Sequence, residues 1–150
     1  MADLPTFTLR RAREEEAAAI RDLVHQVGIN PMGLDWRRFL VAVDAEGKLL
    51  GCGQLKPHGS KVLELASIAV HPGWRRRGIA RAIIRDLLSD SPRPLYLMCR
   101  SGLQPFYEKF GFHSIGGDDL PGYFRRMKRL IAMYERVSYA EETIAIMKLQ

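Results

Sequence analysis

A basic, glycine-containing segment that follows a long apolar run is the part of this sequence best suited to hold a phosphate. The segment reads Arg75-Arg76-Arg77-Gly78-Ile79-Ala80-Arg81, and a helical pattern begins at its glycine. The first turn of a helix has unpaired N–H groups and the positive end of the helix dipole, which together attract anions. We therefore interpret the segment as a pyrophosphate-binding loop, with a glycine that lets the backbone approach the phosphate. The alternative is an ordinary strand–turn–helix with surface arginines, since neither G-x-G-x-x-G nor a Walker Gly-Lys-Ser/Thr is present.

The apolar run before this loop, residues 62–70, contains one carboxylate, Glu64, that could act as a general base. Alternation along a strand predicts that its side chain shares a face with Ala66, Ile68 and Val70. An ammonium group must lose a proton before its nitrogen can attack an acyl group. A partly buried glutamate could accept that proton directly or through water. The alternative is a glutamate at a strand end that points into solvent.

Hydrophobic periodicity predicts the elements that must position these residues. Apolar runs bounded by turn residues predict strands at residues 7–9, 39–43, 49–55, 62–70, 95–99, 112–115 and 143–149. Amphipathic spacing predicts helices at residues 13–27, 78–88, 103–110 and 120–134. The apolar face of the last helix is expected to contain Phe124, Met127, Leu130, Ile131 and Tyr134. Short turns join the early strands antiparallel, and the later strand–helix–strand passage predicts a right-handed parallel unit. The fold class is therefore α/β, a mixed sheet with helices on both faces.

Length and composition limit the classes of protein to consider. The chain has 150 residues and a net charge of +6, and residues 1–150 are expected to form a single domain. The basic excess favours an anionic partner, either a phosphorylated cofactor or nucleic acid. Cys52 and Cys99 have no metal or disulfide spacing and are interpreted as reduced core residues, and no metal is expected. The sequence contains no signal-peptide core and no apolar run of membrane length, so a cytoplasmic protein without a membrane partner is expected.

Two segments together resemble the GNAT superfamily of acetyl-CoA-dependent N-acetyltransferases. Arg75-x-x-Gly78-x-Ala80 is similar to the family's motif A, Q/R-x-x-G-x-G/A, and Val70-His71-Pro72 is similar to the V-x-P that precedes it. Residues 105–112, Pro-Phe-Tyr-Glu-Lys-Phe-Gly-Phe, are similar to motif B. The resemblance implies a GNAT-like fold whose central sheet is mostly antiparallel, with one parallel pair splayed at the fourth and fifth strands. It also implies a single GNAT domain that transfers an acetyl group directly to a primary amine of a small molecule or peptide.

The resemblance further implies roles for individual residues. The strand backbone at Ile68, Ala69 and Val70 would bond to the pantetheine arm of acetyl-CoA. The pyrophosphate would be held by Arg75, Arg76, Arg77, Gly78, Ile79, Ala80 and Arg81. Tyr107 of motif B would give a proton or a hydrogen bond to the departing thiolate, unless its ring only packs in a core helix. Arg100 stands where many family members have a cofactor-contacting asparagine, which leaves that contact open.

Several alternatives remain open from the sequence. The chain could use a longer acyl-CoA, could bind acyl-CoA without transferase activity, or could be a nucleic-acid-binding module suggested by charge alone, although no specific nucleic-acid partner is expected. A covalent route through Cys99 is a less favoured mechanism.

The acceptor side is expected at the loop 30–36 and the basic segment 120–134. A loose similarity of residues 119–138 to N-acetylglutamate synthase-type enzymes implies a substrate carboxylate bound by Arg125, Arg126 or Arg129. The alternative for these arginines is a solvated helix face, and the strand at 143–149 could pair in a homodimer.

Overall fold

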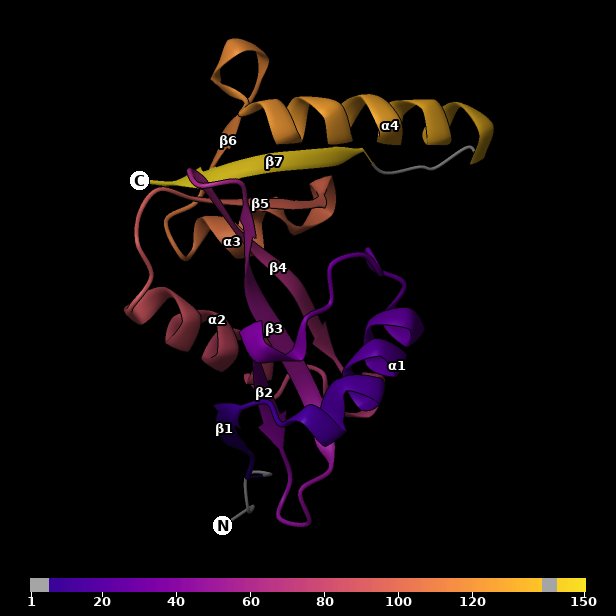
Figure 1. Cartoon of the computed structure of the whole chain (residues 1–150), viewed down its shortest axis with the longest axis vertical. Coiled ribbons are helices and arrows are strands. Elements are labelled where there is room, and N and C mark those ends of the chain that lie inside the picture. The colour runs from indigo at the N-terminus through magenta and orange to yellow at the C-terminus, as the bar shows by residue number, and fades with distance from the viewer. Residues whose placement is uncertain (1–5, 139–142) are drawn as a thin grey trace. The chain divides into compact units, whose positions relative to one another are not determined.

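The structure, a computed structural model, describes residues 6–138 and 143–150. Its strands and helices follow one another in the order predicted from the sequence, with boundaries that differ by a few residues at most (Figure 1). Their bounds are β1 (Thr8–Arg11), α1 (Ala17–Val27), β2 (Phe39–Val43), β3 (Leu49–His58), β4 (Val62–Val70), α2 (Ile79–Ser89), β5 (Leu95–Arg100), α3 (Gln104–Glu108), β6 (His113–Ile115), α4 (Gly122–Ser138) and β7 (Ile144–Leu149).

Within the described residues, seven strands form one mixed sheet in the order β1-β2-β3-β4-β5-β7-β6. The pairs β1–β2, β2–β3, β5–β7 and β6–β7 are antiparallel, whereas β4 and β5 run parallel. The parallel pairing consists of one residue pair, Glu64 with Tyr96. The predicted fold class, a mostly antiparallel mixed sheet with one parallel pair at the fourth and fifth strands and helices around it, is confirmed.

The chain forms two compact units, each with a core of its own. The N-terminal unit comprises Met1–Lys56 and Leu65–Ser91, and the C-terminal unit comprises Pro57–Glu64 and Pro92–Gln150. In the N-terminal unit, α1 packs against one face of β2, β3 and β4, and α2 packs against the opposite face (Figure 1). The core on the α1 face contains Ile20, Leu23, Val24, Phe39, Val41, Val43, Cys52 and Ala69.

Two glycines of β3 let α2 lie very close to the sheet. A Cβ at Gly51 would be 2.8 Å from Ile79 Cγ2, and a Cβ at Gly53 would be 2.8 Å from Ile83 Cγ2. Both separations are well below van der Waals contact, so any side chain at these positions would force the isoleucine side chains of α2 to shift. Because Ile79 is the first residue of α2, these glycines also fix the position of the turn that precedes the helix.

Ser67 interrupts β4 with a backbone conformation that the sequence does not reveal. Its φ is +59°, in the left-handed region that is unusual for a residue other than glycine. Gln54 Nε2 donates to Ser67 Oγ at 2.9 Å, and Cys52 Sγ donates to the Ser67 carbonyl oxygen at 3.5 Å. These two bonds from β3 hold the irregular residue in place.

The irregularity at Ser67 changes which residues of β4 share a face. Ala69 joins the α1 core beside Cys52, whereas Ile68 lies against the α2 face. Glu64 bonds to His58, which alternates with Cys52 along β3 and so belongs to the same face as Cys52. The prediction that Glu64 and Ile68 share a face is therefore wrong, because a bulged residue shifts the two-residue period by one.

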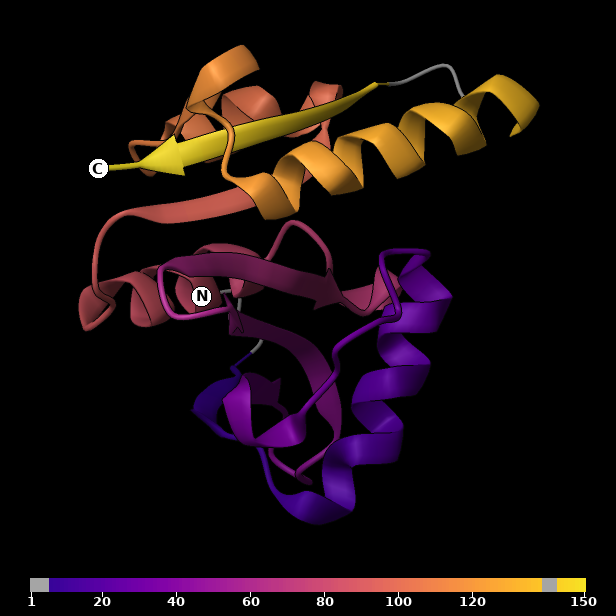
Figure 2. The ribbon, with the colours of Figure 1, turned by 45° about the horizontal axis from the view of Figure 1, so that its top comes forward.

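In the C-terminal unit, α4 packs along β7 (Figure 2). The core there is formed by Tyr96, Leu120, Phe124 and Ile146. Further along α4, the side chains of Leu130 and Met133 are 60% and 66% exposed. Among the described side chains of α4, the predicted apolar face is therefore buried at Phe124 and exposed at Leu130, because periodicity marks a face but not the length of the surface that covers it. The side chain of Tyr134, which is also on the predicted apolar face, lies outside the described ones.

Candidate functional site

The loop predicted to bind pyrophosphate enters α2 through two left-handed residues. Arg76 has a φ of +64°, and Gly78, the N-cap of α2, has a φ of +81°. Left-handed Gly78 is followed directly by Ile79, the first residue of the right-handed α2, and such a pair turns successive N–H groups toward one side, as in an anion-binding nest. The first bond of the helix runs from Ala82 N to the Gly78 carbonyl at 3.0 Å, so the N–H groups of the three residues between them have no partner within the helix.

The surroundings of this loop are basic and open. The side chains of Arg75, Arg76, Arg77 and Arg81 are all exposed. The guanidinium carbon of Arg77 lies 4.8 Å from the centroid of the Trp74 ring, a cation–π contact that orients one of these charges. A Cβ built at Gly78 would meet no atom within 4 Å among the described residues beyond its chain neighbours, so this glycine borders open space. Ile68, Ala69 and Val70, the residues predicted to bind pantetheine, lie in β4 of the same N-terminal unit.

Tyr107, the predicted partner of the leaving group, is buried in α3 of the C-terminal unit. Phe106 and Phe112 pack edge-on against its ring, with centroids 5.1 Å and 6.3 Å away. Burial, and secondly the nearby Cys99, raise the pKa of the phenol. Tyr107 therefore stays protonated at neutral pH and can donate a hydrogen bond but cannot act as a base.

The two cysteines are buried and free. Burial raises the pKa of Cys99 to about 11 and that of Cys52 to about 12. Because the thiolate is the reactive form of cysteine, neither residue is activated as a nucleophile. This chemistry disfavours a covalent acetyl-cysteine route through Cys99.

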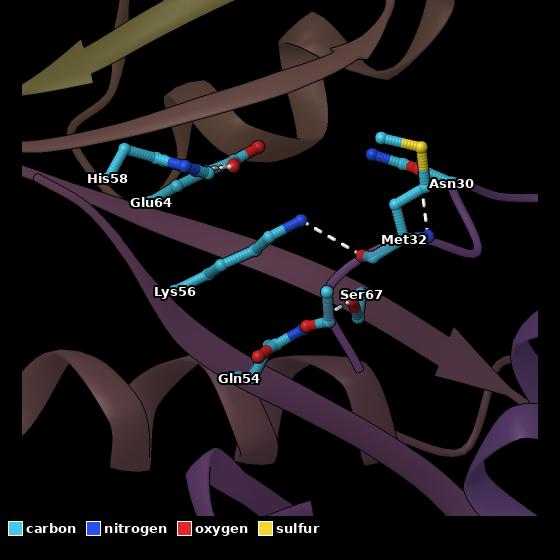
Figure 3. Close-up of polar contacts among 8 residues, drawn as sticks. Asn30, Met32, Gln54, Lys56, His58, Glu64 and Ser67 are labelled. Carbon is cyan, nitrogen blue, oxygen red and sulfur yellow. Dashed lines mark hydrogen bonds and ion pairs between the residues drawn. The ribbon is translucent and has the colours of Figure 1, made fainter. Parts of the chain in front are cut away.

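Glu64 is bonded to a histidine that the sequence analysis did not connect with it. His58 Nε2 lies 2.6 Å from Glu64 Oε1, and their side chains are 11% and 5% exposed (Figure 3). The expectation that Glu64 could be a solvent-facing strand end is therefore wrong. Burial, and secondly the charge of Glu64, raise the pKa of Tyr123, which stacks on the His58 ring. The pairing could have been predicted from the sequence, because His58 and Glu64 lie on either side of the turn that joins β3 to β4.

A second polar group that the sequence analysis missed holds the loop 30–36 against β3 in the N-terminal unit. Lys56 Nζ donates to the Met32 carbonyl at 2.9 Å, and Gln54 Nε2 donates to the Gly33 carbonyl at 3.1 Å (Figure 3). Lys56 is 8% exposed and Gln54 is fully buried. Among the described residues, Gln54 Oε1 has no hydrogen-bond partner. Alternation of Gln54, Lys56 and His58 along β3 was the signal available in the sequence.

The basic residues of α4 lie on its solvent side. Arg125, Arg126 and Arg129 are all exposed, and the Arg125 side chain donates to the Leu120 carbonyl at 3.0 Å. The side chains of residues 134–138, which carry part of the similarity to N-acetylglutamate synthase-type enzymes, are outside the described ones. Where the chain is described, no helix has the length and apolarity needed to span a bilayer. Over the same residues, no three or more His, Cys, Asp or Glu side chains gather as metal ligands would.

The predicted site residues are thus distributed over both units. The loop 75–81 and the β4 residues 68–70 belong to the N-terminal unit, and Glu64 and Tyr107 belong to the C-terminal unit. The two strongest local arrangements are the nest at the start of α2 and the buried pair of His58 with Glu64. One can bind an anion through backbone amides, and the other can accept a proton.

Comparison with known proteins defines the class to which these features belong. The sequence profile of the Acetyltransferase (GNAT) domain matches residues 35–114, more than half of the chain. The chain therefore belongs to the GNAT acetyltransferase family.

Individual relatives are similar over part or all of the chain. The mycothiol acetyltransferase of Mycolicibacterium vanbaalenii is 33% identical over 103 residues, covering 61% of this chain and 34% of the relative. The serotonin N-acetyltransferase of Mesocricetus auratus is 35% identical over 63 residues, covering 39% of this chain and 30% of the relative. This chain thus spans about a third of the length of these curated relatives. Among solved structures, Rv2747 from Mycobacterium tuberculosis, crystallised with CoA and NLQ, superposes with a TM-score of 0.72 at 26% identity, over 95% of this chain and 98% of Rv2747.

Proposed function

We propose that this protein transfers an acetyl group from acetyl-CoA directly to a primary amine of a small molecule or peptide. The observation that carries the proposal is the left-handed turn at Arg76 and Gly78, which directs free amides toward an open, basic surface in a chain of the GNAT family. Residues Arg75, Arg76, Arg77, Gly78, Ile79, Ala80 and Arg81 would hold the pyrophosphate, and the β4 backbone at residues 68–70 would bond to pantetheine. The crystallisation of Rv2747 with CoA supports a CoA-type cosubstrate.

In the proposed reaction, the amine nitrogen attacks the thioester carbonyl carbon. A C–N bond forms, the C–S bond breaks, and the sulfur leaves as a thiolate. The proton that the ammonium loses goes to Glu64, whose burial and hydrogen bond to His58 suit a base held in one orientation. Positioning of the two substrates would supply most of the acceleration.

Tyr107 would stabilise the leaving thiolate mainly by a hydrogen bond. A phenol with a raised pKa gives its proton unfavourably to a thiolate, because the thiol's own pKa is only about 8.5. A hydrogen bond to a charged group contributes about 1.5–3 kcal/mol. The role that fits Tyr107 is therefore donation to developing charge rather than complete proton transfer.

The acceptor class that we favour carries a carboxylate beside its amine. One of the exposed arginines Arg125, Arg126 and Arg129 would pair with that carboxylate, and all three are open to an acidic substrate from solvent. A carboxylate acceptor would be preferred over the corresponding amide. A polyamine or an uncharged aromatic amine as best substrate would assign these arginines to a solvated helix face.

The testing experiment measures release of the CoA thiol from acetyl-CoA. The amines supplied are L-glutamine, spermidine, tryptamine and a peptide with an N-terminal alanine. Amine-dependent thiol release together with a mass increase of one acetyl group on the amine supports the proposal. Faster release of the CoA thiol from a longer acyl-CoA would show that the longer acyl-CoA, and not acetyl-CoA, is the cosubstrate. Tight CoA binding without amine-dependent release of the thiol would indicate a protein that binds acyl-CoA but has no transferase activity.

A further inference from the structure

The distance between His58 and Glu64 requires a proton between them. His58 Nε2 and Glu64 Oε1 are 2.6 Å apart, and a bare imidazole nitrogen and a carboxylate oxygen are both acceptors that would repel each other. Two arrangements put a proton there. Either Nε2–H donates to an ionised Glu64, or a protonated Glu64 donates to a bare Nε2. Only the first leaves Glu64 able to accept a proton.

The surroundings of the imidazole fix its position. The Tyr123 ring stacks on His58, with centroids 3.5 Å apart and planes inclined by 15°. Phe124 meets the same ring edge-on at 6.2 Å and also packs against Tyr96, the residue that pairs with Glu64 in the sheet. Both partners of the hydrogen bond are therefore held from outside, one by aromatic stacking and the other by strand pairing.

The charge on Glu64 needs this partner. A buried carboxylate is costly unless it is hydrogen-bonded, and among the described residues His58 is its only hydrogen-bond partner. The bond uses Oε1, and no described residue forms a hydrogen bond with Oε2. A carboxylate fixed through one oxygen presents the other in a defined direction, which is the geometry that a general base needs.

We propose that His58 is the positioning residue of the catalytic base: its Nε2–H holds Glu64 Oε1, so that Oε2 receives the proton of the acceptor amine. This inference rests on the proposed function. In the step itself, an N–H bond of the ammonium breaks and an O–H bond forms at Oε2, with no change of oxidation state. The proton leaves to solvent after the acetylated product departs, which restores the ionised carboxylate. Tyr123 acts one contact further away, by keeping the imidazole plane in place.

Two substitutions of His58 separate donation from packing. His58→Phe keeps an aromatic ring for Tyr123 to stack on but removes the donor. His58→Gln loses the ring but keeps an N–H group within reach of Glu64. We expect His58→Phe to lower kcat at least tenfold with an unchanged KM for acetyl-CoA, and His58→Gln to restore kcat to within about fivefold of the wild type. The exposed His113, in β6 of the same unit, provides the matched control His113→Gln, which should leave kcat unchanged.

Kinetics are measured with the fastest of the four amines named above, and thermal unfolding shows that each variant is folded. Equal loss in His58→Phe and His58→Gln, or no loss in His58→Phe, overturns the positioning role. Retained activity in Glu64→Gln overturns the proposal that Glu64 is the base. This result distinguishes failure of the proposed base from failure of the positioning role of His58. If no amine is acetylated, nitrogen-15 NMR of the histidine rings still decides between the two proton arrangements. Protonation of Nε2 in the wild type supports the proposal, and a bare Nε2 with the proton on Nδ1 contradicts it.

Discussion

Gly78→Asp would put a negative charge at the centre of the proposed pyrophosphate site. A Cβ at Gly78 meets nothing within 4 Å, so the side chain fits without displacing protein atoms. The backbone φ of +81° costs a non-glycine residue about 1–2 kcal/mol in folding stability, although Asn and Asp tolerate this region better than most. Gly78→Asn has nearly the same shape and the same backbone cost without the charge, and is therefore the matched control.

The expected loss of CoA affinity follows from Coulomb's law. Two unit charges 4 Å apart repel by about 1 kcal/mol in water and about 4 kcal/mol at an effective dielectric constant of 20. Because the loop is exposed, each phosphate charge should contribute near the lower value, and a pyrophosphate carries two such charges. The total of about 1.5–3 kcal/mol corresponds to a 10- to 150-fold weaker Kd for the aspartate than for the asparagine variant.

Titration calorimetry with CoA measures this ratio at about 0.1 M and about 1 M salt. The ratio should shrink at high salt because the Debye length falls from about 10 Å to about 3 Å. Equal CoA affinity in folded Gly78→Asp and Gly78→Asn, or a ratio that salt does not change, would refute the assignment of the pyrophosphate to this turn.

Three further predictions test other parts of the structure. Tyr107→Phe removes only the hydroxyl and should lower kcat roughly 10- to 100-fold with little change in acetyl-CoA binding, since a hydrogen bond to developing charge is lost; an unaltered rate of the chemical step would assign Tyr107 to packing. Gly53→Ala puts a Cβ 2.6 Å from Ile68 Cδ1 and 2.8 Å from Ile83 Cγ2 and should reduce the free energy of unfolding by about 1–3 kcal/mol, measured by urea denaturation; unchanged stability would mean that these two side chains can move away freely. One substitution among Arg125, Arg126 and Arg129 to glutamine should raise the KM of a carboxylate-bearing acceptor and leave that of acetyl-CoA unchanged; three unaffected KM values would contradict the pairing.

The order of elements was predictable because each one carries its own periodicity. The apolar run 62–70 and the glycine-led helix after it were recognisable from residue type alone. The bulge at Ser67 was not, because its left-handed backbone depends on Gln54 and Cys52 of another strand. Contacts of this kind are set by tertiary structure and leave no local pattern.

The candidate site was predictable to a similar degree. The loop at Gly78 is formed by consecutive residues, so its motif can be recognised in the sequence. The environment of Glu64 is not local, because it depends on His58 across a turn and on Tyr123 far along the chain. Leu130 shows a different limit, since a correct helical period placed it on the apolar face of α4 but did not reveal that its side chain is exposed there.

The contact between Gly33 and Lys56 has a consequence for the evolution of this chain. A Cβ at position 33 would lie 2.6 Å from Lys56 Nζ, and Gly33 already has a φ of +70°. A side chain at position 33 would therefore displace the end of the Lys56 side chain, whereas a shorter residue at position 56 would leave room for it. Among homologous sequences the two positions should vary together, with lysine at 56 accompanied by glycine at 33, although 22 residues lie between them in the chain.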